Sequence, residues 1–357
     1  MFRSLQACRA VAALLVVVFH LGATIALAKY SGLTGFALPF AFGHAGVDFF
    51  FVLSGFIIVF VHHRDFACPA RLPHYLAKRA IRIMPTYWLV FLTVYVIAKS
   101  IPALAGTVPD DPLLLLKALL LIPLSKAVVG GTGAPVLVVA WSMQYEVFFY
   151  AVIATFIISR RLGWTLTAGL ALIGAAGGLE APFPISFLTA EPWLIEFLFG
   201  TFTAWAITTR PPTGSPLLLA ILGASSFLLT GAIEVASEFT SVAAQWASHI
   251  AYAASSALVI HGLVRVEQSG RIIGGGRGWQ LLGAASYMLY LIHFPLISAA
   301  LKVAHALGLL DGPVTTFLTY LAILALSTAA AVILHLVIEK PLLDCWAARL
   351  RSSKRPA

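Results

Sequence analysis

Two ionisable residues lie within the first long apolar stretch of the chain, and their spacing places them on one side of a helix. Arg9 and His20 are eleven residues apart in the run LQACRAVAALLVVVFHL. Eleven residues make almost three helical turns, so the two side chains share a face and are separated by about 16 Å along the axis. Because ionisable groups are costly in hydrocarbon, each is a candidate functional residue.

Three more titratable residues lie inside apolar stretches: Asp48 in GVDFFFVLSGF, Glu146 in WSMQYE and His293 in SYMLYLIHFPL. Each lies about eight to ten residues inward from the outer end of its expected span, so we expect a depth similar to that of His20. A neutral imidazole can take a proton from a hydroxyl group while a carboxylate orients the ring and stabilises the imidazolium. His20 is therefore the candidate base, with Asp48 or Glu146 as its orienting carboxylate.

Hydroxyl groups in the same apolar segments are candidates for hydrogen bonds to a sugar or to a developing oxyanion. The residues with these candidate roles are Ser142, Tyr287, Tyr290 and also His293.

A basic cluster lies in the segment HYLAKRAIRIMP, which carries Lys78, Arg79 and Arg82. We expect Pro85 to open the third span directly after it. A guanidinium matches the oxygens of a phosphate and keeps its charge. Together with Arg9 near the cytoplasmic surface, the cluster suits the phosphates of a nucleotide-type donor such as coenzyme A.

Several of these residues also have a purely structural interpretation. Arg9 can snorkel to the interface, and the basic cluster can be a topology anchor. Asp48 can cap a local helix break. Most single intramembrane histidines only pack or form hydrogen bonds, and we favour that interpretation for His249, His261 and His335. Carboxylates and histidines on several helices also suit a proton relay, so spacing alone leaves acyl transfer and transport open.

The composition indicates that most of the chain is surrounded by lipid. Hydrophobic residues make up 60% of it and charged residues only 10%, roughly half the fraction expected of a soluble domain. We interpret the formal net charge of +9 as membrane topology rather than nucleic-acid binding. Cys8, Cys68 and Cys345 form no CxxC pair, so we expect neither a disulfide framework nor a thiolate metal site, and no metal cofactor.

Hydrocarbon about 30 Å thick requires about 20 apolar residues in a helix. By that measure the chain has ten spans: 5–27, 40–62, 84–104, 135–159, 163–179, 193–209, 215–233, 245–264, 279–301 and 315–337. The first is long and holds two ionisable groups, so we expect a retained helix rather than a signal peptide. The short apolar stretch 112–125 is expected to be interfacial or re-entrant.

The distribution of basic residues supports this topology. With both termini in the cytoplasm, about 17 basic residues fall in inner segments and about 5 in outer segments, as the positive-inside rule predicts. The expected fold is therefore an all-α integral membrane protein with about ten transmembrane helices and cytoplasmic termini.

The motifs together resemble the acyltransferase 3 family of bacterial membrane acyltransferases. The family signature of an arginine, ten residues and a histidine is matched by Arg9 and His20. GVDFFFVLSGFII, KRAIRIMPTYW, AWSMQYE, LGAASYMLYLIHFPL and EKPL resemble further family landmarks in the expected order. The resemblance covers about residues 5–342 and is strongest to short members associated with exopolysaccharide O-acetylation. Departures are small, with Cys8, Ala10 and Lys78 where leucine, glycine and arginine are common. The resemblance indicates an acyltransferase 3 transmembrane domain over 1–342 and a basic cytoplasmic tail over 343–357.

This resemblance implies transfer of an acyl group, usually acetyl, from cytoplasmic acyl-CoA to a carbohydrate hydroxyl. It implies that His20 is the catalytic histidine and Arg9 the essential arginine, with Arg79 and Arg82 in donor binding or architecture. The expected partners are membrane lipid, a carbohydrate or lipid-linked oligosaccharide acceptor and polysaccharide assembly machinery, with no nucleic acid. The expected location is the bacterial cytoplasmic membrane. The rival hypotheses are a transporter or flippase for a glycolipid or small anion, and a membrane scaffold.

Overall fold

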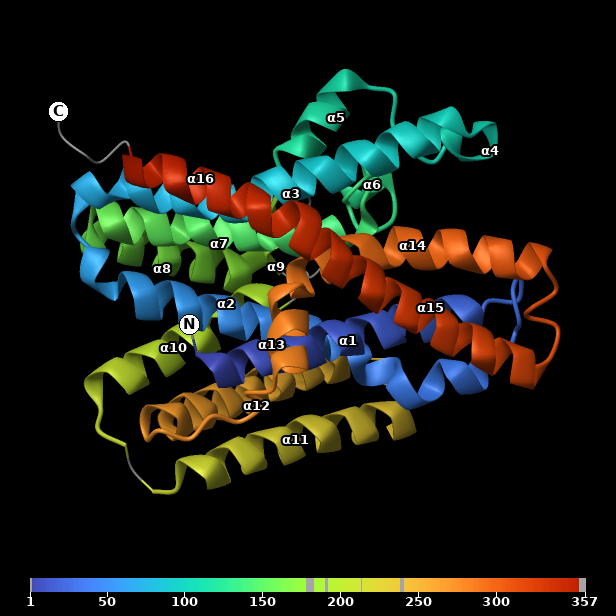
Figure 1. The fold of residues 1–357 in the computed structure, drawn as a ribbon. Coiled ribbons are helices and arrows are strands. Elements are labelled where there is room, and N and C mark those ends of the chain that lie inside the picture. The colour runs from blue at the N-terminus through green and yellow to red at the C-terminus, as the bar shows by residue number, and fades with distance from the viewer. Residues whose placement is uncertain (1, 178–182, 190–191, 213, 238–240, 353–357) are drawn as a thin grey trace. The chain divides into compact units, whose positions relative to one another are not determined.

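The computed structural model describes residues 2–177, 183–189, 192–212, 214–237 and 241–352. All regular secondary structure in these ranges is helical, which confirms the all-α prediction (Figure 1). The chain divides into two compact units, Met1–His63 with Glu191–Val332 and Arg64–Ala190 with Ile333–Ala357.

Eight helices in the described part of the chain are long and apolar enough to cross a membrane. They are Arg3–Ile25, Leu38–Asp65, Pro69–Ser100, Val138–Ile158, Pro216–Ser237, Ala244–Gln268, Ser286–Ala306 and Pro313–Trp346. Each coincides with one of the ten predicted spans, so the chain is a multi-pass membrane protein.

The other two predicted spans, 163–179 and 193–209, are helical as α8 (Arg160–Gly177) and α10 (Trp193–Thr209). Residues 178–179 lie outside the described ranges. The α8 helix begins with two arginines, and the 17 residues of α10 reach only about 26 Å. Ten crossings and cytoplasmic termini therefore stay predictions.

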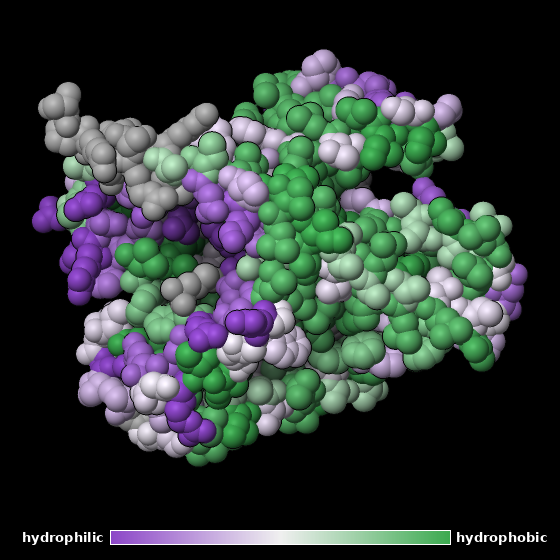
Figure 2. Space-filling model, viewed as in Figure 1, coloured by the Kyte–Doolittle hydropathy of each residue, from purple (hydrophilic) through white to green (hydrophobic). Residues whose placement is uncertain are grey.

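Apolar side chains cover the outer faces of the long helices, as expected where lipid is the solvent. Figure 2 shows them in green, and α15 (Pro313–Leu334) is an example. Its exposed large side chains are all hydrophobic: Val314, Phe317, Leu318, Leu321, Leu326 and Ile333.

The first unit is built around its N-terminal helix. Its elements are α1 (Arg3–Ile25), η1 (Thr34–Phe36), η2 (Leu38–Ala45), α2 (Gly46–His62), α10, α11 (Pro216–Ser237), α12 (Val242–Gln268), α13 (Arg277–Ala284), α14 (Ser286–Ala306) and α15. The α1 helix contacts η2, α2, α12, α13 and α14, while α2 packs on α10 and α11 on α12. The helix that carries Arg9 and His20 is thus surrounded by most of the unit.

A carboxylate from α12 caps the start of α1. The first N–H groups of a helix have no partner within the helix, and the residue before α1 supplies no side-chain cap. Glu267 accepts hydrogen bonds from the backbone N–H groups of Arg3 and Ser4, each at 2.8 Å. The negative charge also suits the positive end of the helix dipole.

The α2 and α10 helices approach so closely that only glycine fits at two points. A Cβ atom added to Gly200 would lie 1.9 Å from the carbonyl oxygen of Val52, and one added to Gly55 would lie 2.2 Å from that of Phe197. Small residues allow this kind of backbone contact between membrane helices. The spacing of the two helices is therefore fixed by backbone rather than by flexible side chains.

The second unit holds the basic cluster. Its elements are η3 (His63–Asp65), η4 (Pro69–Arg71), α3 (Leu72–Ser100), α4 (Pro102–Ala105), α5 (Pro112–Leu119), α6 (Lys126–Val129), η5 (Val138–Ala140), α7 (Trp141–Ile158), α8, α9 (Ile185–Thr189), η6 (His335–Glu339) and α16 (Lys340–Ser352). The α7 helix contacts both α3 and α8, and α16 contacts α3. Part of the stretch expected to be interfacial or re-entrant, 112–125, forms α5, which begins after the capping residue Asp111.

The structure corrects the predicted start of the third span. Pro85 lies inside α3, which begins at Leu72, and does not open the helix. A helix held by its neighbours tolerates the one hydrogen bond that an internal proline removes. Lys78 and Arg82 consequently lie on a helix rather than in a loop. Most of the predicted tail 343–357 is likewise helical, since α16 runs to Ser352, and residues 353–357 lie outside the described ranges.

Candidate active site

His20 and His293 form a hydrogen-bonded pair between α1 and α14. Nδ1 of His20 lies 3.2 Å from Nε2 of His293 and 3.0 Å from the carbonyl oxygen of Val16. His293 is fully buried, whereas His20 keeps part of its surface accessible. The sequence placed these histidines at similar depth, and the structure places them in contact.

The backbone carbonyls around this pair determine which nitrogen of each neutral ring carries the proton. Nδ1 of His293 lies 2.8 Å from the carbonyl oxygen of Tyr290 and 3.1 Å from that of Leu289. A carbonyl oxygen only accepts hydrogen bonds, so Nδ1 carries the proton in both His293 and His20. Nε2 of His293 then accepts from Nδ1–H of His20. This leaves the lone pair on Nε2 of His20 as the basic position of the pair.

Aromatic side chains surround the pair. The rings of Phe19 and Phe294 pack on His20, with centroid distances of 5.0 and 5.4 Å. The ring of Tyr290 lies 5.8 Å from that of His293, and Tyr287 precedes it by one helical turn. Both tyrosines are half-buried, and Tyr290 is the one that lies beside the histidine pair.

Arg9 is held at the other end of the same helix pair. Its guanidinium is buried, and it donates to Oγ of Ser286 at 2.9 Å. Arg9 and His20 thus contact α14 at Ser286 and His293 in the same order, so α1 and α14 run parallel. Parallel helices agree with the prediction that these two spans cross the membrane in the same direction. The sequence interpretation overlooked Ser286, although it lies within the motif LGAASYMLYLIHFPL.

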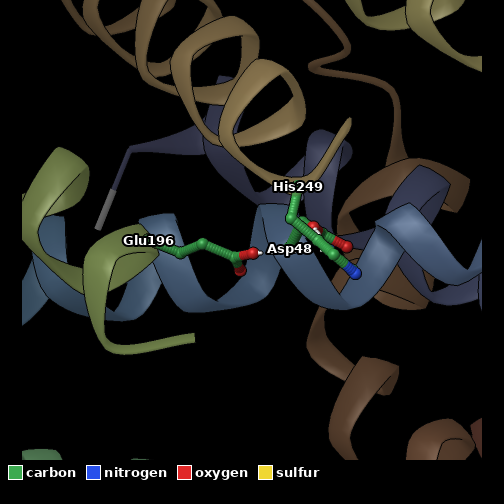
Figure 3. A group of neighbouring side chains, drawn as sticks. All are labelled: Asp48, Glu196 and His249. Carbon is green, nitrogen blue, oxygen red and sulfur yellow. Dashed lines mark hydrogen bonds and ion pairs between the residues drawn. The ribbon is translucent and has the colours of Figure 1, made fainter. Parts of the chain in front are cut away.

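Asp48 binds a different histidine. Its Oδ1 lies 2.5 Å from Nδ1 of His249, and Glu196 lies 3.6 Å from the same nitrogen (Figure 3). The glycine at the start of α2, Gly46, packs on the carbonyl oxygen of Ala12. Because α2 runs antiparallel to α1, Asp48 lies nearer the level of Arg9 than that of His20, which differs from the expected common depth. The direct partner of His20 is instead His293.

Further polar residues continue from Asp48 toward the start of α2. Nδ1 of His44 lies 4.0 Å from Oδ2 of Asp48, and its Nε2 lies 2.7 Å from Glu234. The hydroxyl of Tyr252 donates to the same Glu234 carboxylate at 2.5 Å. Sequence reasoning assigned no role to Glu196 or Glu234, although the cost of burying a carboxylate within an apolar segment applied to Glu196 as well.

In the second unit, Arg79 lies over two aromatic rings. Its guanidinium carbon is 5.9 Å from the ring centre of Tyr75 and 5.6 Å from that of Tyr150. The Tyr150 hydroxyl donates to the carboxylate of Glu146. Cation–π contacts of this kind orient a guanidinium.

The remaining predicted residues of this unit lie on α3 and α7. Lys78 and Arg82 are exposed, whereas Ser142 is buried and donates to the carbonyl oxygen of Val139 at 3.3 Å. In the second unit, Tyr150 thus links Arg79 to Glu146. In the first unit, His20 contacts His293 of α14, and Arg9 contacts Ser286 of the same helix.

Comparison with known proteins agrees with these motifs. The chain matches the family model described as an acyltransferase domain over residues 2–336. It is 32% identical over 321 residues to the exopolysaccharide production protein ExoZ of Rhizobium meliloti (strain 1021), an alignment that covers 87% of this chain and 92% of the relative. No solved structure gives a significant match.

Proposed function

Because the chain belongs to the acyltransferase 3 family, we propose that it moves an acetyl group from cytoplasmic acetyl-CoA to a sugar hydroxyl. The acceptor is an exopolysaccharide or its lipid-linked precursor, and the enzyme works in the bacterial cytoplasmic membrane. The family supports acyl transfer, and the similarity to an exopolysaccharide production protein supports the acceptor class. The observation that carries the proposal is the hydrogen bond from Nδ1 of His20 to His293, which leaves Nε2 as a base.

In the proposed reaction, Nε2 of His20 removes the proton from the sugar hydroxyl as its oxygen attacks the thioester carbonyl. The C–S bond then breaks, and the coenzyme A thiolate recovers the proton from the His20 imidazolium. The Nδ1–H group donates to His293 and to the Val16 carbonyl throughout, which stabilises the positive charge on the ring. The proton that His20 takes from the sugar hydroxyl is thus the proton that it returns to the coenzyme A thiolate. In a two-step variant, Nε2 first takes the acetyl group as an acyl-histidine.

The other predicted residues have supporting roles in this proposal. Arg9 binds donor phosphates, and its contact with Ser286 aligns it. Tyr290 lies beside His293, Tyr287 lies one turn before it on α14, and both bind the sugar. Ser142 is proposed to donate a hydrogen bond to the sugar or the oxyanion.

The basic cluster of the second unit is proposed to bind donor phosphates as well. Lys78 and Arg82 are exposed, so both are accessible to the phosphates of coenzyme A, and Arg79 is oriented by Tyr150. Glu146 contributes by holding Tyr150. Asp48 contributes through its contact with His249, which holds α2 against α12. Both of these helices pack on α1.

The proposal is tested with purified protein in nanodiscs supplied with acetyl-CoA. Free thiol release is measured for the parent, His20→Ala and Arg9→Ala, with and without a membrane glycolipid extract. His261→Ala in α12, outside the histidine pair, is the matched control. Acceptor-dependent release in the parent and control, with none in the two variants, supports acetyl transfer. Release that persists in His20→Ala contradicts the mechanism, and a parent that binds no coenzyme A favours a transporter.

A further inference from the structure

A second cluster of titratable side chains lies apart from the histidine pair. Asp48 of α2, Glu196 of α10 and His249 of α12 converge so that one ligand atom from each lies within 4.8 Å of the other two. All three residues are buried, and the two carboxylates have no exposed surface. Figure 3 shows Glu196 reaching from α10 toward the pair formed by Asp48 and His249.

The two carboxylates cannot relieve their repulsion by moving apart. Glu196 is adjacent to Phe197, whose carbonyl oxygen meets Gly55 of α2, and Gly200 meets Val52 in the same way. These backbone contacts fix the distance between α2 and α10. The cluster therefore brings two acidic groups together in a part of the molecule with a low dielectric constant.

The charges of the cluster leave room for a cation. Like charges this close in a buried site disfavour each other, and a single imidazolium neutralises only one of two carboxylates. Oδ2 of Asp48 accepts no hydrogen bond from the described residues, and its ion-pair distance to His44 is 4.0 Å. A divalent cation among the three ligand atoms would neutralise both carboxylates. It would also leave His249 neutral, as a metal ligand requires.

We infer that Asp48, Glu196 and His249 form a binding site for a divalent first-row transition-metal ion, with Zn²⁺ as the best match. One imidazole nitrogen and two carboxylate oxygens are typical zinc ligands, whereas Mg²⁺ prefers oxygen ligands and retained waters. Zinc bonds of about 2.0–2.2 Å in tetrahedral geometry separate ligand atoms by about 3.3 Å. The distances from Nδ1 of His249, 2.5 Å to Asp48 and 3.6 Å to Glu196, lie on either side of that value.

The ion would have a structural role. The proposed acyl transfer balances its protons and needs no Lewis acid, while the three ligands come from three helices that pack together. Zinc would cross-link α2, α10 and α12 and so stabilise the packing around the neighbouring α1. The sequence did not reveal the site, because the ligands are far apart in the chain and His249 alone is more simply explained by packing.

The test is a zinc-binding measurement on the full-length protein in nanodiscs. The protein is stripped with a chelator and dialysed against buffered Zn²⁺, and bound zinc is counted by mass spectrometry. Glu196→Gln and His249→Gln remove one ligand each with little change in size. Glu234→Gln is the matched control, because its carboxylate binds His44 and Tyr252 in the same unit but is not one of the three ligands.

The expected result is about one zinc per chain for the parent and for Glu234→Gln, with affinity at least about tenfold weaker in the other two variants. Zinc should also raise the unfolding temperature of the parent but not of those variants. The inference is overturned by a folded parent that binds no zinc, or by equal zinc binding in all four proteins. The inference also fails if metal-free Glu196→Gln unfolds at a higher temperature than the zinc-treated parent. A proton shared between the two carboxylates would then be enough to relieve their repulsion. Neither zinc binding nor the unfolding temperature depends on acyl transfer, so the inference can fail independently of the proposed function.

Discussion

His20 donates from Nδ1 to the buried Nε2 of His293 across 3.2 Å, and the two rings are tilted with their centres 5.0 Å apart. In this arrangement a second histidine orients the ring of His20, as a carboxylate does in many sites with a histidine base. A neutral partner stabilises the imidazolium less than an anion would, yet it costs less to bury within a membrane helix. We therefore expect His293 to act as a positioning residue whose hydrogen-bonding capacity matters more than its charge.

Replacement of His293 separates hydrogen bonding from volume. His293→Leu should lower kcat for acyl transfer by about 100-fold, because the base loses the partner that fixes its tautomer. His293→Gln keeps an acceptor and should lower it by only about tenfold. The KM for acetyl-CoA should change little in either variant. Equal rates for parent and His293→Leu in a steady-state thiol-release assay would contradict the positioning role.

Loss of the Ser286 hydroxyl should affect the donor rather than the chemistry. Ser286→Ala removes a hydrogen bond to a buried guanidinium, which is worth about 1.5–3 kcal/mol. We expect the KM for acetyl-CoA to rise by about tenfold with kcat nearly unchanged, since Arg9 loses its alignment. Ser327→Ala is the matched control, because that buried serine donates to a carbonyl of its own helix, at 2.8 Å. A fall in kcat alone would place Arg9 in the chemical step instead.

The ring and the hydroxyl of Tyr150 can be tested separately. Tyr150→Leu removes one of the two rings against which Arg79 lies, a contact worth about 0.5–2 kcal/mol, and coenzyme A binding should weaken by about three- to tenfold. Tyr150→Phe keeps the ring and loses only the bond to Glu146, so its affinity should lie between those of parent and Tyr150→Leu. Calorimetric titration with coenzyme A gives both values. Unchanged binding in Tyr150→Leu would remove Arg79 from the donor site.

The contact between α2 and α10 should tolerate no added methyl group. Gly200→Ala places a Cβ atom 1.9 Å from the carbonyl oxygen of Val52, and overpacking of this kind costs about 1–3 kcal/mol. We expect a lower unfolding temperature in detergent and a lower yield of folded protein. Gly278→Ala provides the control, because its added Cβ meets no atom within 4 Å. A Gly200→Ala protein as stable as the control would show that the two helices can move apart.

Apolar runs about 20 residues long predicted the helices of the fold well, because lipid demands them wherever a chain crosses. Arg9 and His20 were placed on one face by helical geometry alone, and the structure keeps both on α1. Proline was a poorer guide. Pro85 is typical of a helix start in water, but α3 continues through it between neighbouring helices.

The partners of the titratable residues could not be predicted from spacing along the chain. Asp48 and His249 are 201 residues apart, and no local pattern indicates which of several intramembrane histidines a carboxylate will meet. The depth of Asp48 depended on how α2 lies along α1, which the contact of Gly46 with Ala12 determines. Such contacts arise from packing between helices, so a sequence interpreted one helix at a time does not contain them.

The carboxylate that caps α1 has a consequence for how the protein is made. Residues 3 and 4 are synthesised well before Glu267, which follows Arg3 by 264 residues. Nascent α1 therefore enters the bilayer with its first amide groups bound to water or to other temporary partners. His293 is translated later still. Under the proposed mechanism, His20 is thus synthesised before its partner, and the chain can become active only when α14 has been inserted.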